Sequence, residues 1–196
     1  DPATWYACMP MLAYGILPLE RIQEEFDSVP ENVFRKELLC QWVTSEDRVI
    51  PLDAWEAVLT NRPLPAGGRF LAVDVNPERT AGAIAGCVAD HVELIEHRQG
   101  TGWLLSVAVD LARKYKCKVA LDPHGPAGSL AHDLQKSGVR VVALTQTELA
   151  QASTEFFDAV VQRRLAVGRS YLLDDAVSYA TKKPVGDSWR WARRNT

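Results

Sequence analysis

The chain has 196 residues, of which 47% are hydrophobic and 24% are charged. These proportions are typical of a globular protein and exclude a disordered or collagen-like chain. The sequence contains neither an apolar run of roughly 18 residues, as a membrane-spanning helix needs, nor a basic segment leading into an apolar one. We therefore expect no transmembrane helix and no signal peptide, and either one domain with an arm or two small domains.

Charge is distributed unevenly along the chain. The net charge is −3, but residues 1–66 hold 5 basic and 11 acidic side chains, whereas residues 67–196 hold 17 basic and 14 acidic ones. Five basic side chains lie close to the C-terminus: Lys182, Lys183, Arg190, Arg193 and Arg194. This asymmetry predicts that the basic end contacts an anionic partner, and a solvated basic tail is the alternative.

A change of composition divides the chain. The segment 61–68 has two prolines and two glycines and predicts a linker. Residues 1–66 are expected to form an acidic, Trp-rich arm, and residues 67–196 a separate domain. Short helices are expected in the arm over 18–26, 33–39 and 52–59, the last with Asp53 as a candidate N-cap. We expect this arm to have little core of its own and to pack on another surface.

After the linker, three apolar runs at 70–75, 81–88 and 91–97 are joined by short turns. Short connections require antiparallel pairing, so these runs predict three antiparallel strands.

The remaining segments alternate between helical and strand patterns. Helices are expected over 103–114, 128–137, 147–165 (starting at Thr147) and 171–181. Strands are expected over 118–122, 139–144 and 185–192. Strands that alternate with helices indicate parallel pairing. The predicted fold is therefore α/β, with a mixed sheet of three antiparallel strands followed by parallel strands, and with helices on both faces.

Two aspartates occupy unusual positions for a carboxylate. Asp74 lies inside the first apolar run, and Asp122 ends the fourth. Burying a carboxylate is costly unless it is hydrogen-bonded, ion-paired or bound to a metal. Because the first and fourth strands of such a sheet can be neighbours, we expect the two carboxylates to approach each other. For either aspartate alone, a turn former or a helix cap is the alternative.

Such a pair has a definite chemistry. Two adjacent carboxylates repel each other, and a divalent cation relieves that repulsion. Hard oxygen ligands favour Mg²⁺ or Mn²⁺. Two such ions can activate water and stabilise the leaving oxygen of a phosphodiester. Asp74 and Asp122 therefore predict a metal site for phosphodiester hydrolysis.

Other candidates carry weaker signals. Asp187 is a candidate third acid, with a turn former as the alternative. The glycine-rich segment 125–129 lacks the G-x-x-x-x-G-K-S/T pattern of a P-loop and excludes that motif. Trp189 and Trp191 lie among the basic side chains. Packing is the interpretation that we favour for this pair, and a nucleic-acid surface is the alternative.

Several segments are distinctive when they are taken in order: Phe70-Leu-Ala-Val-Asp-Val-Asn-Pro77, Val119-Ala-Leu-Asp-Pro-His-Gly-Pro-Ala127, Leu173-Asp-Asp-Ala-Val-Ser-Tyr-Ala180 and Trp189-Arg-Trp-Ala-Arg-Arg194. Together they resemble the nuclease half of the large terminases of tailed phages. Asp1-Pro-Ala-Thr-Trp5 and Phe34-Arg-Lys-Glu-Leu38 resemble the segment that joins the ATPase half to the nuclease half in that family. The resemblance covers nearly the whole chain.

The resemblance implies an RNase H-like nuclease that cuts concatemeric double-stranded viral DNA during genome packaging with two divalent metals. It implies that Asp74 and Asp122 are metal ligands and that the DNA backbone is gripped without base readout. It also implies a terminase ATPase domain, a small terminase subunit and a portal as partners. The implied location is the cytoplasm of the infected bacterial host, with no membrane contact.

One feature departs from the family pattern. Large terminases usually carry a third acid at the start of a late helix, beyond the Trp-x-Trp-x-Arg stretch, and the sequence ends at Thr196. The third ligand is then Asp187, Asp175 or a residue beyond Thr196. The ATPase motifs are also absent, so no translocation is expected of these residues.

Two functions from different classes remain. The first is a metal-dependent DNA endonuclease, with Asp74, Asp122 and Asp187 in the metal site and the five basic residues near the C-terminus on the DNA. The alternative is a catalytically silent RNase H-like module that docks the packaging motor, the portal or the small subunit. A nucleotide-binding α/β enzyme is a third possibility, but three opening antiparallel strands and the lack of a phosphate loop disfavour it.

Overall fold

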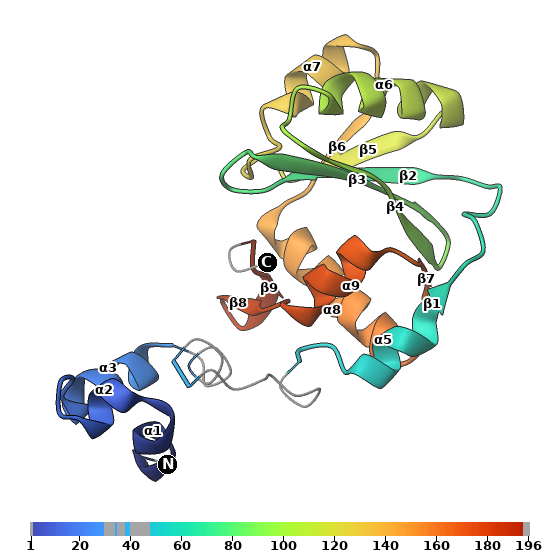
Figure 1. Cartoon of the computed structure of the whole chain (residues 1–196). Helices are drawn as coiled ribbons and strands as arrows, with labels where there is room; N and C mark the ends of the chain where they lie inside the picture. Colours follow the sequence, from blue (N-terminus) through green and yellow to red (C-terminus); the bar gives the residue numbers. More distant parts are fainter. Residues whose placement is uncertain (1, 30–33, 35–37, 40–47, 194–196) are drawn as a thin grey trace. The chain divides into compact units, whose positions relative to one another are not determined.

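A computed structural model describes residues 2–29, 34, 38–39 and 48–193 (Figure 1). The chain divides into two compact units, Asp1–Arg48 and Val49–Thr196. None of the helices described is both long enough and apolar enough to cross a membrane.

In its described residues, the first unit has three short helices with given bounds and a small core. The helices are α1 (Pro2–Cys8), α2 (Pro10–Ala13) and α3 (Leu19–Ser28). The rings of Trp5, Phe26 and Phe34 pack with centroids 5.0–5.3 Å apart. The expectation that this segment has little core of its own is therefore wrong, because the aromatic side chains pack against one another.

Outcomes for the helices expected in the arm differ. The helix expected over 18–26 is confirmed as α3, whereas most of the segment 33–39 lies outside the described residues. The helix expected over 52–59 is α5 (Leu52–Val58), and it belongs to the second unit. Its N-cap is Pro51, and Asp53 lies in the first turn, so the N-cap prediction for Asp53 is wrong.

The contact boundary at 48/49 therefore precedes the Pro/Gly segment 61–68. Two features hold α5 in the second unit. Trp55 Nε1 donates a hydrogen bond of 2.8 Å to Asp174 Oδ1, and Trp55 packs in one apolar cluster with Val160 and Val167. The apolar face of α5 is buried by residues more than a hundred positions away, which local composition does not reveal.

The second unit is built on a seven-stranded mixed sheet with the order β1-β7-β4-β3-β2-β5-β6. Its strands are β1 (Leu59–Thr60), β2 (Phe70–Val75), β3 (Ala81–Val88), β4 (His91–Gln99), β5 (Lys118–Leu121), β6 (Val141–Ala143) and β7 (Ala166–Gly168). Strands β2, β3 and β4 pair antiparallel, whereas β5 joins β2 in parallel and β6 joins β5 in parallel. The predicted fold class is confirmed. The two short strands β1 and β7 were not predicted.

Helices cover both faces of this sheet. Helices α6 (Leu104–Tyr115) and α7 (Leu130–Lys136) lie on one face, and α5, α8 (Gln146–Val161) and α9 (Tyr171–Ser178) lie on the other (Figure 1). Side chains in β2 alternate between the two faces, because successive residues of a strand point in opposite directions. Leu71, Val73 and Val75 are buried in the core beneath α6 and α7. Asp74 therefore points to the opposite face.

The last predicted strand, 185–192, is instead part of a hairpin. Strands β8 (Lys182–Val185) and β9 (Ser188–Trp191) pair antiparallel in a small sheet of their own. The two residues between them are Gly186, with φ +58°, and Asp187. Glycine adopts this left-handed conformation at little cost, which allows a two-residue turn and explains why the run folds back.

The loop after β5 is tightly packed at Gly128. A Cβ at this position would lie 2.1 Å from the carbonyl oxygen of Pro123. We expect Gly128→Ala to lower the free energy of unfolding by about 2–3 kcal/mol, because the backbone must shift to accommodate the methyl group. Urea denaturation measures this loss. Gly102→Ala is the matched control, since a Cβ there meets nothing within 4 Å. Equal losses in both variants would contradict the steric explanation.

Candidate functional site

Parallel pairing of β2 with β5 brings Asp74 and Asp122 to one edge of the sheet. Ala72 of β2 is the register partner of Ala120 of β5. Asp74 lies two residues after Ala72, and Asp122 lies two residues after Ala120. Both carboxylates contact the guanidinium of Arg193. Its Nε lies 3.2 Å from Asp74 Oδ2, and one terminal nitrogen lies 3.0 Å from Asp122 Oδ2. The expected pairing of the two strands is confirmed, and the two aspartates meet at Arg193, a contact that was not predicted.

Asp122 is almost completely buried, with 1% of its side chain exposed. Its Oδ1 accepts a hydrogen bond of 2.9 Å from the backbone N–H of His124, and its Oδ2 also lies 3.9 Å from Arg190. Burial alone would raise the pKa of Asp122. The hydrogen bonds from Arg193 and His124 and the charges of both arginines outweigh burial and lower the pKa below its ordinary value. The carboxylate is therefore ionised at neutral pH.

Asp74 is more accessible, with 54% of its side chain exposed. It opens onto a cleft of about 440 Å³ that β2, β3, β4, α8, α9 and β9 line. Ala83 and His97 stand in the same row across the sheet, since Asp74 pairs with Ala83 and Ala83 pairs with His97. Sequence reasoning missed His97 as a cleft residue. The strand alternation would have placed it on this face once the register was known.

Arg193 fits closely between the two carboxylates. A Cβ at Gly125 would lie 3.0 Å from a guanidinium nitrogen of Arg193 and 3.0 Å from Asp122 Oδ2. The absence of a side chain at Gly125 therefore leaves room for the bridge. Burial opposes the charge of Arg193, but Asp74 and Asp122 outweigh it and raise the pKa of the guanidinium further.

Helix α8 supplies a further contact. Gln146, its first residue, accepts a hydrogen bond of 2.9 Å from Arg190 and lies 3.5 Å from Asp122 Oδ1. The helix begins at Gln146 rather than at the predicted Thr147, because Thr145 and Glu148 form a capping box. In this cap, Thr145 Oγ1 accepts from the Glu148 N–H, and Glu148 Oε2 accepts from the Thr145 N–H.

The two candidate third acids within the chain lie on the hairpin and on α9. Asp187 is exposed at the turn of the β8–β9 hairpin, and Asp175 is exposed on α9. Across the described part of the chain, no three side chains of His, Cys, Asp or Glu form a group that could hold a metal. The assignment of a third ligand stays a prediction.

The five basic residues predicted to contact DNA have different surroundings. Arg190 and Arg193 are paired with the site carboxylates. Lys182 Nζ lies 4.3 Å from the ring centroid of Trp189, a cation–π contact, and Lys183 is exposed on β8. Arg194 lies outside the described residues.

The donor chemistry fits a divalent cation. Two carboxylate oxygens converge on one positive group, and oxygen is the donor that Mg²⁺ and Mn²⁺ prefer. Asp74 and Asp122 are the residues that would hold the ion.

The sequence matches no protein-family model and no curated protein. Solved structures do match. The large terminase nuclease from thermophilic phage G20c has a TM-score of 0.55 at 12% identity, with 72% of this chain and 88% of that one covered. The same nuclease with bound magnesium gives a TM-score of 0.54 at 12% identity, with 71% and 84% covered.

A large terminase from a thermophilic bacteriophage has a TM-score of 0.52 at 13% identity, with 91% of this chain and 49% of that chain covered. The chain thus spans about half the length of that protein. The structural neighbours are large terminases and their nuclease domains, as the sequence resemblance predicted. At these identities, the comparison establishes a shared fold.

The capping box should contribute measurably to stability. We expect Thr145→Ala to lower the free energy of unfolding by about 1 kcal/mol, because the Glu148 N–H loses its acceptor. Thr145→Ser keeps the hydroxyl and should stay close to the original chain. Urea denaturation of the two variants separates the effects, and equal losses would assign the effect to the missing methyl group.

Proposed function

We propose that the chain is a divalent-metal-dependent endonuclease that cuts concatemeric double-stranded viral DNA during genome packaging. The observation that carries this proposal is that Asp74 and Asp122 lie together at the ends of β2 and β5, where both contact the guanidinium of Arg193. The fold shared with large terminase nucleases supports it, as does the magnesium bound to one of those neighbours.

The residues of the site have distinct roles in this proposal. Asp74 and Asp122 hold Mg²⁺ or Mn²⁺, with Asp187, Asp175 or an acid beyond Thr196 as the third ligand of a two-metal site. Divalent metals in such a site lower the pKa of water and stabilise the leaving oxygen of a phosphodiester. The cleft beside Asp74 admits the scissile phosphate, and Gln146 holds Arg190 next to Asp122.

The DNA is held through its phosphates rather than its bases. Five basic side chains supply the positive charge: Lys182, Lys183, Arg190, Arg193 and Arg194. Contacts between basic side chains and phosphates carry little sequence information. In the full large terminase this nuclease would act with an ATPase domain, a small terminase subunit and a portal. That assembly would lie in the cytoplasm of the infected bacterial host.

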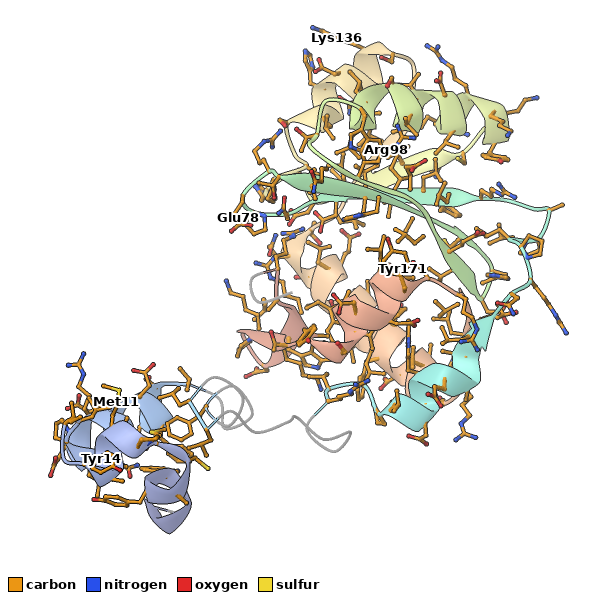
Figure 2. The ribbon with its side chains drawn as sticks, viewed as in Figure 1. Met11, Tyr14, Glu78, Arg98, Lys136 and Tyr171 are labelled. Atoms are coloured by element: carbon orange, nitrogen blue, oxygen red, sulfur yellow. The ribbon has the colours of Figure 1, made fainter. Side chains whose placement is uncertain are left out.

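A catalytically silent docking module is the second candidate. Two observations favour it. Arg193 already satisfies both carboxylates, and the first unit exposes large apolar side chains, among them Met11 and Tyr14 (Figure 2). Such a module would neither bind divalent metal at Asp74 nor cut DNA.

Plasmid cleavage distinguishes the two functions. We expect the chain to nick and linearise supercoiled plasmid with Mn²⁺ or Mg²⁺ and to be inactive with EDTA. Asp74→Asn should reduce the rate by at least about 100-fold, the order expected when a group that stabilises the transition state is lost. Asp53→Asn removes an exposed carboxylate of α5 and is the matched control. Activity that resists EDTA, or that survives in Asp74→Asn, would contradict the metal site.

DNA binding should depend strongly on salt. The logarithm of affinity falls with the logarithm of salt concentration by about 0.9 per phosphate contact. Lys183→Gln should therefore reduce the slope by about 0.9, because one contact is lost. Lys136→Gln, on α7 beyond the opposite face of the sheet (Figure 2), should leave the slope unchanged. Fluorescence anisotropy with labelled duplex DNA at several salt concentrations measures both slopes, and equal slopes would remove Lys183 from the interface.

A further inference from the structure

Arg193 is the strongest feature that the proposed function leaves unexplained. A side chain meant only to grip phosphates would point its guanidinium to solvent. Instead, 25% of the Arg193 side chain is exposed, and its guanidinium contacts Asp74 at 3.2 Å and Asp122 at 3.0 Å. The two atoms contacted, Asp74 Oδ2 and Asp122 Oδ2, are carboxylate oxygens that the proposed metal would need as ligands.

The segment that carries Arg193 is anchored nearby. The N–H of Ala192 donates to the carbonyl of Thr181 at 2.9 Å, and the N–H of Trp191 lies 3.4 Å from the Ser153 hydroxyl on α8. The Trp191 ring also packs edge-on against Phe156, with centroids 6.3 Å apart. The contacts of Trp191 and Ala192 therefore fix the backbone just before Arg193 and place its side chain at the carboxylates.

The contact of Arg193 with the two aspartates balances their negative charge. Two carboxylates at one edge of a sheet repel each other, and Asp122 is buried where water does not screen it. Arg193 bridges the pair, and Arg190 adds a second positive charge at 3.9 Å from Asp122. The two arginines together neutralise the two aspartates.

We propose that Arg193 is the internal counter-cation of the carboxylate pair and competes with the divalent metal for it. Arg193 holds Asp74 and Asp122 together while no metal is bound, and it must leave them when a metal binds. It is thus a positioning residue that sets the metal affinity. Its released guanidinium suits a DNA phosphate, because its planar donors match phosphate oxygens. This inference rests on the metal site of the proposed function.

Metal affinity is the decisive measurement. Isothermal titration of the metal-free chain with Mn²⁺ should give a dissociation constant about 10-fold lower for Arg193→Gln than for the original chain. A competing state that occupies roughly nine-tenths of the molecules weakens apparent affinity by this factor. Arg163→Gln is the matched control, since it removes an exposed arginine that pairs with Asp53.

A second readout tests the holding role. In EDTA, Arg193→Gln should have a lower Tm than the original chain, and Mn²⁺ should raise its Tm by more. If Arg193→Gln is too unstable to study, Arg193→Lys keeps the charge but loses the forked contact. It should bind Mn²⁺ with intermediate affinity.

The outcomes separate this inference from the proposed function. If the original chain binds Mn²⁺ and Arg193→Gln binds it equally or less tightly, the competition is overturned and the metal site stands. If neither chain binds Mn²⁺, the metal site fails and the competition fails with it.

Discussion

Parallel pairing of β2 with β5 is the constraint on which the site depends. It sets Asp74 and Asp122 at one edge of the sheet, although residues 76–117, which contain β3, β4 and α6, separate β2 from β5. The side chains of β2 alternate between the buried core and the opposite face of the sheet. Leu71, Val73 and Val75 anchor the strand in the core, and Asp74 points away from that core. Because alternate side chains of β2 are buried in the core, the strand fixes the position of Asp74.

A buried carboxylate must then be accommodated. Leaving Asp122 charged and unpaired in the interior would cost several kcal/mol. The loop after β5, the first residue of α8 and the segment after β9 all donate to it or lie beside it. Gly125 leaves space for one of these donors, and Gly128 allows the loop to close against Pro123. Elements that are distant in sequence are thus tied together by one charge.

The hairpin and α8 form the wall of the cleft opposite the sheet. Trp189 and Trp191 pack on Phe157 and Phe156 of α8, which fixes β9 against the helix. The same strand carries Arg190, and Arg193 follows it. Packing is the interpretation favoured for the tryptophan pair, and the structure confirms it. By packing, the tryptophans hold the arginines at the carboxylates.

Strands β2 to β6 could be predicted from the sequence, because the period of the apolar residues indicates which side of each strand is buried. The two aspartates could be predicted as well, because a carboxylate in an apolar run needs a partner. The fold was needed to show that the partner is Arg193, that α5 joins the second unit, that β1 and β7 extend the sheet, and that the segment 185–192 belongs to a hairpin. The reason is physical. Periodicity encodes a face locally, whereas the meeting of Arg193 with Asp74, 119 residues away, depends on where the hairpin packs.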